Sequence, residues 1–227
     1  VIGDVEPLFI LRNYSASKLA EKRKQVLIQH NLKSAYLTNF EAAEATQNFL
    51  SAYQNYPLLM GMKTNLYKCF IPQSWMLAKD SGICGFLHPE GVYDDIKGGS
   101  LREAIYPRLK YHFQFENELT LFTGTNDHGR MRFGLHIYIN KYSKDINFSQ
   151  ISNLFSPQTI YKCFDHSGQG PIPGIKDDNK WSIKGHKNRI VRCGIDELAL
   201  FAKLFDSAGS SPLKARLPVL HSTLIVD

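Results

Sequence analysis

The sequence predicts an α/β protein, and the prediction rests on how its central region is ordered. A short apolar strand pattern at 82–91 (GICGFLHPEG) follows a helical pattern at 63–82 and precedes another at 98–109. This is the order expected for one crossover of an α/β sheet. Ligands of such sheets bind beyond the C-terminal ends of the strands, so the residues around and after Pro89 are the first candidates for a site.

Two helices are predicted before this central region. The first spans 13–31, with Ser15 or Ser17 as its N-cap. Arg23 and the neighbouring lysines give it a basic face, which either is simply solvated or contacts phosphates. The second helix spans 38–55, and its expected core contacts are Phe40, Ala43, Phe49, Leu50 and Tyr53.

The central helices carry clear boundary signals. Pro72 lies inside the helical pattern at 63–82, so a kink is expected there. After the strand comes a polar loop, and Gly98-Gly99-Ser100 opens the next helix. Tyr106-Pro107 shortens that helix.

Two aromatic-rich strands follow. The stretch at 110–118 alternates, with tyrosine and phenylalanine on one side and His112 and Gln114 on the other. The second strand covers 131–141, and the turn formers between the two include Asn126, Asp127 and Gly129. These features predict an antiparallel pair, which suits the second half of a doubly wound sheet.

The pattern weakens from residue 143 onward. The Gly/Pro/Asp-rich stretch at 165–180 is a candidate boundary. Its glycine spacing is not a dinucleotide fingerprint, because no clear strand precedes it and prolines interrupt it. A final helix is predicted over 194–209 and is ended by Gly209.

Composition limits the partners. The 227 residues carry a formal net charge of +6 and a sequence pI of about 9.0, which is compatible with a polyanionic partner. No apolar run reaches the roughly 18 residues that a membrane span needs, so no membrane partner is predicted. The N-terminal residues lack a signal-peptide pattern and an initiator Met, so the chain is expected to be a piece of a longer protein.

The cysteines indicate a reducing, cytoplasmic compartment. Cys69, Cys84, Cys163 and Cys193 are scattered and form no C-x-x-C pair. Free thiols in apolar surroundings behave as small core residues. The sequence therefore predicts structural cysteines and no metal site.

Several stretches in a fixed order resemble a known family. They are N-L-Y-K-C-F at 65–70, G-F-L-H-P at 85–89, G-G-S-L-R at 98–102 and F-E-N-E-L-T-L-F at 115–122. The region from 63 to 140 resembles the part that follows the catalytic motif in large adenine-specific (N6) DNA methyltransferases. These enzymes belong to restriction–modification and related phage-defence systems.

Shorter matches at 3–21 and 215–222 fit the same proteins. The resemblance implies the C-terminal half of a Rossmann-like fold that binds S-adenosylmethionine, with a partial sheet, helices and an antiparallel strand pair. Residues 1–142 would then be the C-terminal part of the methyltransferase domain, and 143–227 a linker and the start of a following region.

The reaction implied moves a methyl group from S-adenosylmethionine to the N6 atom of an adenine that is flipped out of double-stranded DNA. Restriction or helicase subunits are further implied partners. The substrate-binding candidates are Asn65, Tyr67, Phe86, His88, Pro89 and Tyr138.

Three of these candidates have an open alternative. Asn65 either lies near the base pocket or caps its helix, and Tyr138 is either a stacking residue or an ordinary strand aromatic. His88 is either a general base or the donor of a structural hydrogen bond.

DNA-backbone contacts are predicted around the helix that begins at Gly98. Exposed N–H groups and the positive dipole end favour phosphate there. The candidates are Lys97, Ser100, Arg102, Arg108 and Lys110.

The chain departs from the family at the catalytic motif. It contains no Pro-Pro pair, whereas the family's tetrapeptide is Asn/Asp-Pro-Pro-aromatic, and it has no glycine-rich cofactor turn. Both elements, and every catalytic residue, are expected upstream of Val1, so the chain alone is predicted to be inactive. A non-catalytic DNA-binding or scaffold module is the alternative, and another α/β enzyme such as an oxidoreductase is a third.

Overall fold

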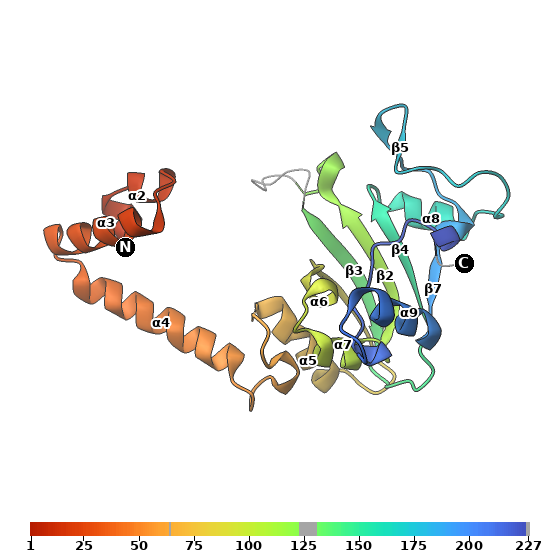
Figure 1. The fold of residues 1–227 in the computed structure, drawn as a ribbon, viewed down its shortest axis with the longest axis horizontal. Coiled ribbons are helices and arrows are strands. Elements are labelled where there is room, and N and C mark those ends of the chain that lie inside the picture. The colour runs from red at the N-terminus through yellow and green to blue at the C-terminus, as the bar shows by residue number, and fades with distance from the viewer. Residues whose placement is uncertain (64, 123–130, 226–227) are drawn as a thin grey trace. The chain divides into compact units, whose positions relative to one another are not determined.

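The computed structural model describes residues 1–63, 65–122 and 131–225, with only the backbone described at 225. The chain divides into two compact units, Val1–Asn55 and Tyr56–Asp227. Figure 1 shows the elements of each unit along the chain. None of the helices in the described residues is long and apolar enough to cross a membrane.

The first unit is helical. Helix α3 begins after Ser15, as predicted, and Val26 is its buried residue. Of the core contacts expected for the second helix, Leu50 of α4 is buried, whereas Phe40, Ala43 and Phe49 of α4 and Tyr53, which follows it, are exposed. A unit of this size cannot cover every side of a long helix, which explains the difference. The helices are α1 (Ile2–Val5), α2 (Leu8–Leu11), α3 (Ala16–Gln29) and α4 (Lys33–Ser51).

The second unit is built on a mixed sheet, which in the described residues has five strands in the order β1-β3-β2-β4-β7. Figure 1 labels β3, β2, β4 and β7 of this sheet. Strand β3 is antiparallel to both of its neighbours, so β1 and β2 run in the same direction. Strand β4 is parallel to β2, and β7 is antiparallel to β4. The strands are β1 (Ile83–Pro89), β2 (Leu109–Glu116), β3 (Arg132–Ile139), β4 (Phe148–Leu154) and β7 (Val191–Cys193).

This arrangement confirms an α/β fold with an antiparallel pair at β2 and β3. The chain crosses from β1 to β2 through helices, and β3 then inserts between those two strands. The predicted turn formers Asn126, Asp127 and Gly129 lie outside the described residues.

The helices of the second unit largely follow the predicted pattern. Helix α5 continues through Pro72 and ends at Leu77. Helix α9 ends at Phe205, earlier than predicted, and Gly209 lies in a later turn with φ +82°. The α-helices are α5 (Leu66–Leu77), α6 (Gly91–Asp94), α7 (Gly99–Ile105), α8 (Gln158–Phe164) and α9 (Ile195–Phe205).

Shorter elements complete this unit. Strands β5 and β6 form a small antiparallel pair within the loop that the sequence marked as a boundary. These elements are η1 (Pro57–Leu59), η2 (Asn117–Leu119), β5 (Lys176–Asp177), β6 (Lys180–Trp181), η3 (Lys187–Arg189), η4 (Pro212–Lys214) and η5 (Thr223–Ile225).

The two faces of the sheet differ in chemistry because side chains alternate along each strand. On one face Phe113 and Phe115 of β2 join a hydrophobic cluster that includes Cys163 of α8. His112 and Gln114 lie on the other face, as the predicted alternation requires, and both are buried. A buried polar layer therefore lies on the face opposite the hydrophobic cluster.

The sheet continues across the predicted boundary at 142/143. The stretch where the sequence pattern weakens forms β4, which pairs with β2. Its polar residues Gln150, Ser152 and Asn153 are buried, so β4 lacks the apolar alternation of an ordinary strand. Residues after 142 are thus part of the same compact unit, and are not a linker.

The C-terminal segment 212–222 (the closing segment) is hydrogen-bonded to residues of the second unit that lie on the polar side of the sheet. The hydroxyl of Tyr106 donates to the carbonyl of Ala215 at 2.6 Å, and the amide of Leu217 donates to the carbonyl of Tyr93 at 3.1 Å. The resemblance at 215–222 therefore falls on a segment that is integral to this unit.

Candidate functional site

Four of the predicted substrate-binding residues come together at the end of β1. The ring of Tyr67, at the start of α5, stacks on the ring of His88 with 5.1 Å between centroids. The Nε2 atom of His88 lies 3.4 Å from the Tyr138 hydroxyl, and the Phe86 and Tyr138 rings are 6.2 Å apart. The N-L-Y stretch and the G-F-L-H-P strand are therefore neighbours in space.

This aromatic cluster is closed. Tyr138 is fully buried and His88 is 4% exposed, so neither presents a ring face to a base. Burial lowers the pKa of His88 to about 4, and the imidazole Nδ1 lies 2.8 Å from the Pro89 carbonyl. The predicted roles of Tyr138 in stacking and of His88 at the pocket mouth are corrected: Tyr138 is a buried strand aromatic, and His88 makes a structural hydrogen bond.

Asn65 and Pro89 are exposed, and Tyr67 is half-buried. Asn65 occupies the N-cap position of α5, but its side chain makes no capping hydrogen bond. Burial, followed by the charges of Asp94 and Glu90, raises the pKa of Tyr67 to about 12, so its hydroxyl stays protonated at neutral pH. These three residues, with the half-buried Phe86, form the accessible part of the predicted substrate site.

Arg102 does not serve as a phosphate contact, and this prediction is corrected. Its side chain is 1% exposed, and its guanidinium donates to the carbonyls of Lys214, Val92 and Asp95 at 3.0, 3.1 and 2.7 Å. Helix α7 is too short for its sequence pattern to indicate that the Arg102 side chain points inward. Arg102 is a structural cross-link between α6, α7 and the closing segment.

The start of α7 is also covered. Gly98 is buried, and a Cβ atom on Gly99 would lie 3.3 Å from the Lys214 side chain. Arg108 is half-buried, donates to the Ala104 carbonyl at 2.9 Å and stacks 4.7 Å from the Trp75 ring. Among the predicted phosphate contacts, the exposed ones are Lys97, Ser100 and Lys110.

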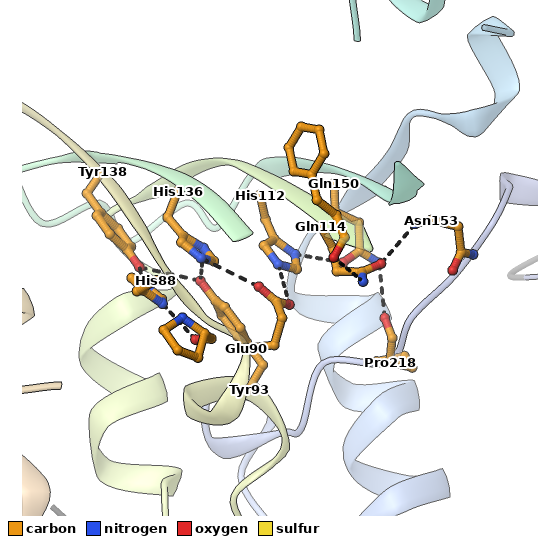
Figure 2. Close-up of polar contacts among 12 residues, drawn as sticks. His88, Glu90, Tyr93, His112, Gln114, His136, Tyr138, Gln150, Asn153 and Pro218 are labelled. Carbon is orange, nitrogen blue, oxygen red and sulfur yellow. Dashed lines mark hydrogen bonds and ion pairs between the residues drawn. The ribbon is translucent and has the colours of Figure 1, made fainter. Parts of the chain in front are cut away.

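The buried polar layer contains a cluster of one carboxylate and two histidines (Figure 2). Glu90 follows β1 directly, and His112 of β2 lies opposite His136 of β3 in the strand register. The Glu90 Oε2 atom is 2.8 Å from His112 Nε2, and Oε1 is 3.5 Å from His136 Nε2. We call these three residues the Glu-His-His cluster.

Neighbouring side chains hold the Glu-His-His cluster in place. The Tyr93 hydroxyl lies 3.1 Å from His136 Nδ1, and Gln150 Oε1 lies 3.4 Å from His112 Nδ1 (Figure 2). The rings of His112 and His136 are stacked, 5.1 Å apart. Each imidazole therefore has one nitrogen held by a neighbour and the other aimed at Glu90.

The polar layer extends toward β4. Gln114 Oε1 accepts a hydrogen bond from the backbone amide of Asn153 at 2.8 Å. The Gln150 side-chain amide donates to the carbonyl of Pro218 at 3.5 Å, which links the layer to the closing segment (Figure 2).

The sequence interpretation did not assign the Glu-His-His cluster. The alternation at 110–118 placed His112 and Gln114 on one side of their strand. This was the available sequence signal for the cluster. His136 lies in the same phase of the neighbouring strand, but strand register cannot be read from a single sequence. Glu90 stood in a polar loop, where nothing indicated that it turns back over the sheet.

Comparisons with solved structures give distant similarities. No protein-family model matches the chain, and no curated protein matches it. A solved structure of the type IIG restriction endonuclease BpuSI aligns with a TM-score of 0.42 and 11% sequence identity, covering 65% of this chain and 17% of that chain. The chain thus corresponds to less than a fifth of that endonuclease, and a similarity of this level carries no functional argument.

Proposed function

We propose that this chain forms the C-terminal part of an adenine-specific (N6) DNA methyltransferase domain within a larger restriction–modification or phage-defence protein. In that protein, S-adenosylmethionine and the catalytic motif belong to the part upstream of Val1. The chain supplies one wall of the pocket that receives the flipped adenine, and the exposed residues Asn65 and Pro89 border that pocket.

One observation carries the proposal. The two stretches on which the resemblance chiefly rests, N-L-Y at the start of α5 and G-F-L-H-P in β1, are in contact through the Tyr67–His88 stack. Their meeting point is the C-terminal end of a strand, where ligands of α/β sheets bind. Asn65 has an exposed side chain without a capping bond, so it is available to a ligand.

The proposal is tested by a methyl-transfer assay on the whole protein. It should transfer labelled methyl groups from S-adenosylmethionine to DNA, and the product should be N6-methyladenine. We expect Asn65→Ala to slow transfer by about tenfold, the effect of losing one hydrogen bond of about 1.4 kcal/mol. The chain alone should give no detectable transfer.

The matched control is Gln73→Ala, which changes an exposed amide on the same helix α5. It should leave the rate unchanged. If the whole protein binds DNA but produces no N6-methyladenine, the methyltransferase proposal fails. The alternative of a non-catalytic DNA-binding module then takes its place.

DNA binding by the chain should depend strongly on salt, because phosphate contacts release counterions. Replacing both Lys97 and Lys110 by alanine should reduce the slope of log affinity against log salt by about 2, one for each lysine. Fluorescence anisotropy with a DNA duplex at several salt concentrations measures this slope. Lys203→Ala, at an exposed lysine of α9, is the control, and equal slopes in all proteins would contradict the assignment of Lys97 and Lys110.

A further inference from the structure

The Glu-His-His cluster has the composition and spacing of a transition-metal site. The ligand atoms of Glu90, His112 and His136 all lie within 4.8 Å of one another. Two imidazoles and one carboxylate are a common ligand set for zinc, which prefers four tetrahedral ligands. We propose that these three side chains bind a divalent metal ion of the zinc class.

The distances suit such an ion. Zinc ligands lie about 2.0–2.1 Å from the metal, so two ligands at a tetrahedral angle are about 3.3 Å apart. Glu90 Oε2 lies 2.8 Å from His112 Nε2, and Glu90 Oε1 lies 3.5 Å from His136 Nε2, on either side of this value. A metal ion can therefore be accommodated by small side-chain shifts, without moving the strands.

Unsatisfied polar atoms point to the same place. In the described part of the chain, His136 Nε2 and Glu90 Oε1 are buried and have no hydrogen-bond partner. His136 is fully buried, so water cannot compensate this nitrogen from the surface. Buried polar atoms without a partner are rare and destabilising, and a metal ion would satisfy both atoms at once.

The surrounding residues select the ligand form of each histidine. Gln150 donates its amide to Pro218, which leaves its carbonyl oxygen to accept the Nδ1–H of His112. The Tyr93 hydroxyl lies 3.1 Å from Nδ1 of His136 and can accept the Nδ1–H of the tautomer whose Nε2 is free to bind a metal. Outer contacts of this kind fix the tautomer and orientation of metal-binding histidines.

Space for an ion is kept by Gly134. A Cβ atom at this position would overlap Glu90 Oε1 and the His136 ring. The Glu90 side chain is 15% exposed, whereas both histidines are buried. Three protein ligands leave the fourth tetrahedral position to water or another small ligand.

The test uses the complete chain after treatment with a chelator. Titration with Co²⁺ alone should produce the visible absorption bands of a tetrahedral site at one ion per chain, and Zn²⁺ should abolish them by displacement. At a Zn²⁺ concentration a hundredfold above Kd, the melting temperature should rise by about 5–10 °C. His136→Gln and Glu90→Gln should each weaken binding by at least a hundredfold.

Two further variants separate coordination from folding. Gln150→Leu leaves all three ligands in place and should weaken Co²⁺ binding by about 10–100-fold, as expected for an outer contact. Gly134→Ala should block the site sterically, with its ligands unchanged. Circular dichroism of each metal-free variant identifies those that fold.

The controls address other histidines. His30 is exposed in the first unit, and His166 lies beside His186 with 4.3 Å between ring centroids. His30→Gln and His166→Gln should bind Co²⁺ like the unaltered chain. The proposal is overturned if the unaltered chain binds no metal, or if binding survives in folded His136→Gln and Glu90→Gln. Neither outcome bears on methyl transfer, so this inference and the proposed function stand or fall separately.

Discussion

Arg102→Met should lower the free energy of unfolding by roughly 3–5 kcal/mol. Methionine fills much of the same volume but donates no hydrogen bonds, so three backbone carbonyls lose a charged donor. Two of them, at Val92 and Asp95, belong to one chain segment, and the third, at Lys214, belongs to the closing segment. A buried acceptor without a donor costs about 1–3 kcal/mol, which sets the size of the effect.

Urea unfolding monitored by circular dichroism measures this loss. Arg108→Met is the matched control, because Arg108 is half-buried and makes one local carbonyl contact, to Ala104 at the end of α7. It should cost about 1 kcal/mol. Equal losses in both variants would show that the Arg102 contacts contribute nothing beyond ordinary packing. Loss of DNA binding in a fully folded Arg102→Met protein would instead restore Arg102 as a phosphate contact.

Gly185→Ala should destabilise the second unit by about 3 kcal/mol, the upper end of the usual cost of overpacking. The added Cβ atom would overlap the backbone of α8 at Lys162 and lie 2.6 Å from the amide nitrogen of Cys163. Backbone atoms cannot rotate away as a side chain can, so the helix or the loop at 185 must shift. Thr159 of the same helix donates to the carbonyl of Ile183, which restricts that shift.

Gly85→Ala provides the comparison for this prediction. A Cβ atom there would lie 3.5 Å from the side chain of Ile137, an ordinary contact. Its effect on stability should be within about 0.5 kcal/mol. Differential scanning calorimetry of both variants measures the two changes in stability. Similar melting temperatures would mean that the loop at 185 shifts to accommodate the added Cβ atom at little cost.

The order of elements from 63 to 141 could be predicted because each has a local signal. A helical run that passes into an apolar strand ended by Pro89, and two alternating aromatic strands, depend on residues close in sequence. Local signals also placed His112 and Gln114 on one side of their strand. The strand order of the sheet, with β3 between β1 and β2, depends on contacts between residues distant in sequence. It therefore could not be predicted from local patterns.

The features that the sequence did not predict, or predicted wrongly, share a physical cause. Strand β4 was overlooked because Gln150, Ser152 and Asn153 are buried polar residues, which look like surface positions in a sequence. Arg102 was assigned to DNA for the same reason: an arginine is expected at the surface unless its hydrogen bonds are known. The Glu-His-His cluster required both a strand register and a turn of the chain at Glu90. In each case polar residues are stabilised inside the protein by partners far along the chain.

The closing segment sets where this protein can be divided. A truncation at residue 142 would remove β4, which pairs with β2, and would also remove the carbonyl partners of Arg102 and Tyr106 at Lys214 and Ala215. A chimera made to exchange a neighbouring domain should therefore be joined after residue 222. For protein engineering, the smallest portable block that keeps this sheet intact runs from Tyr56 to the end of the closing segment.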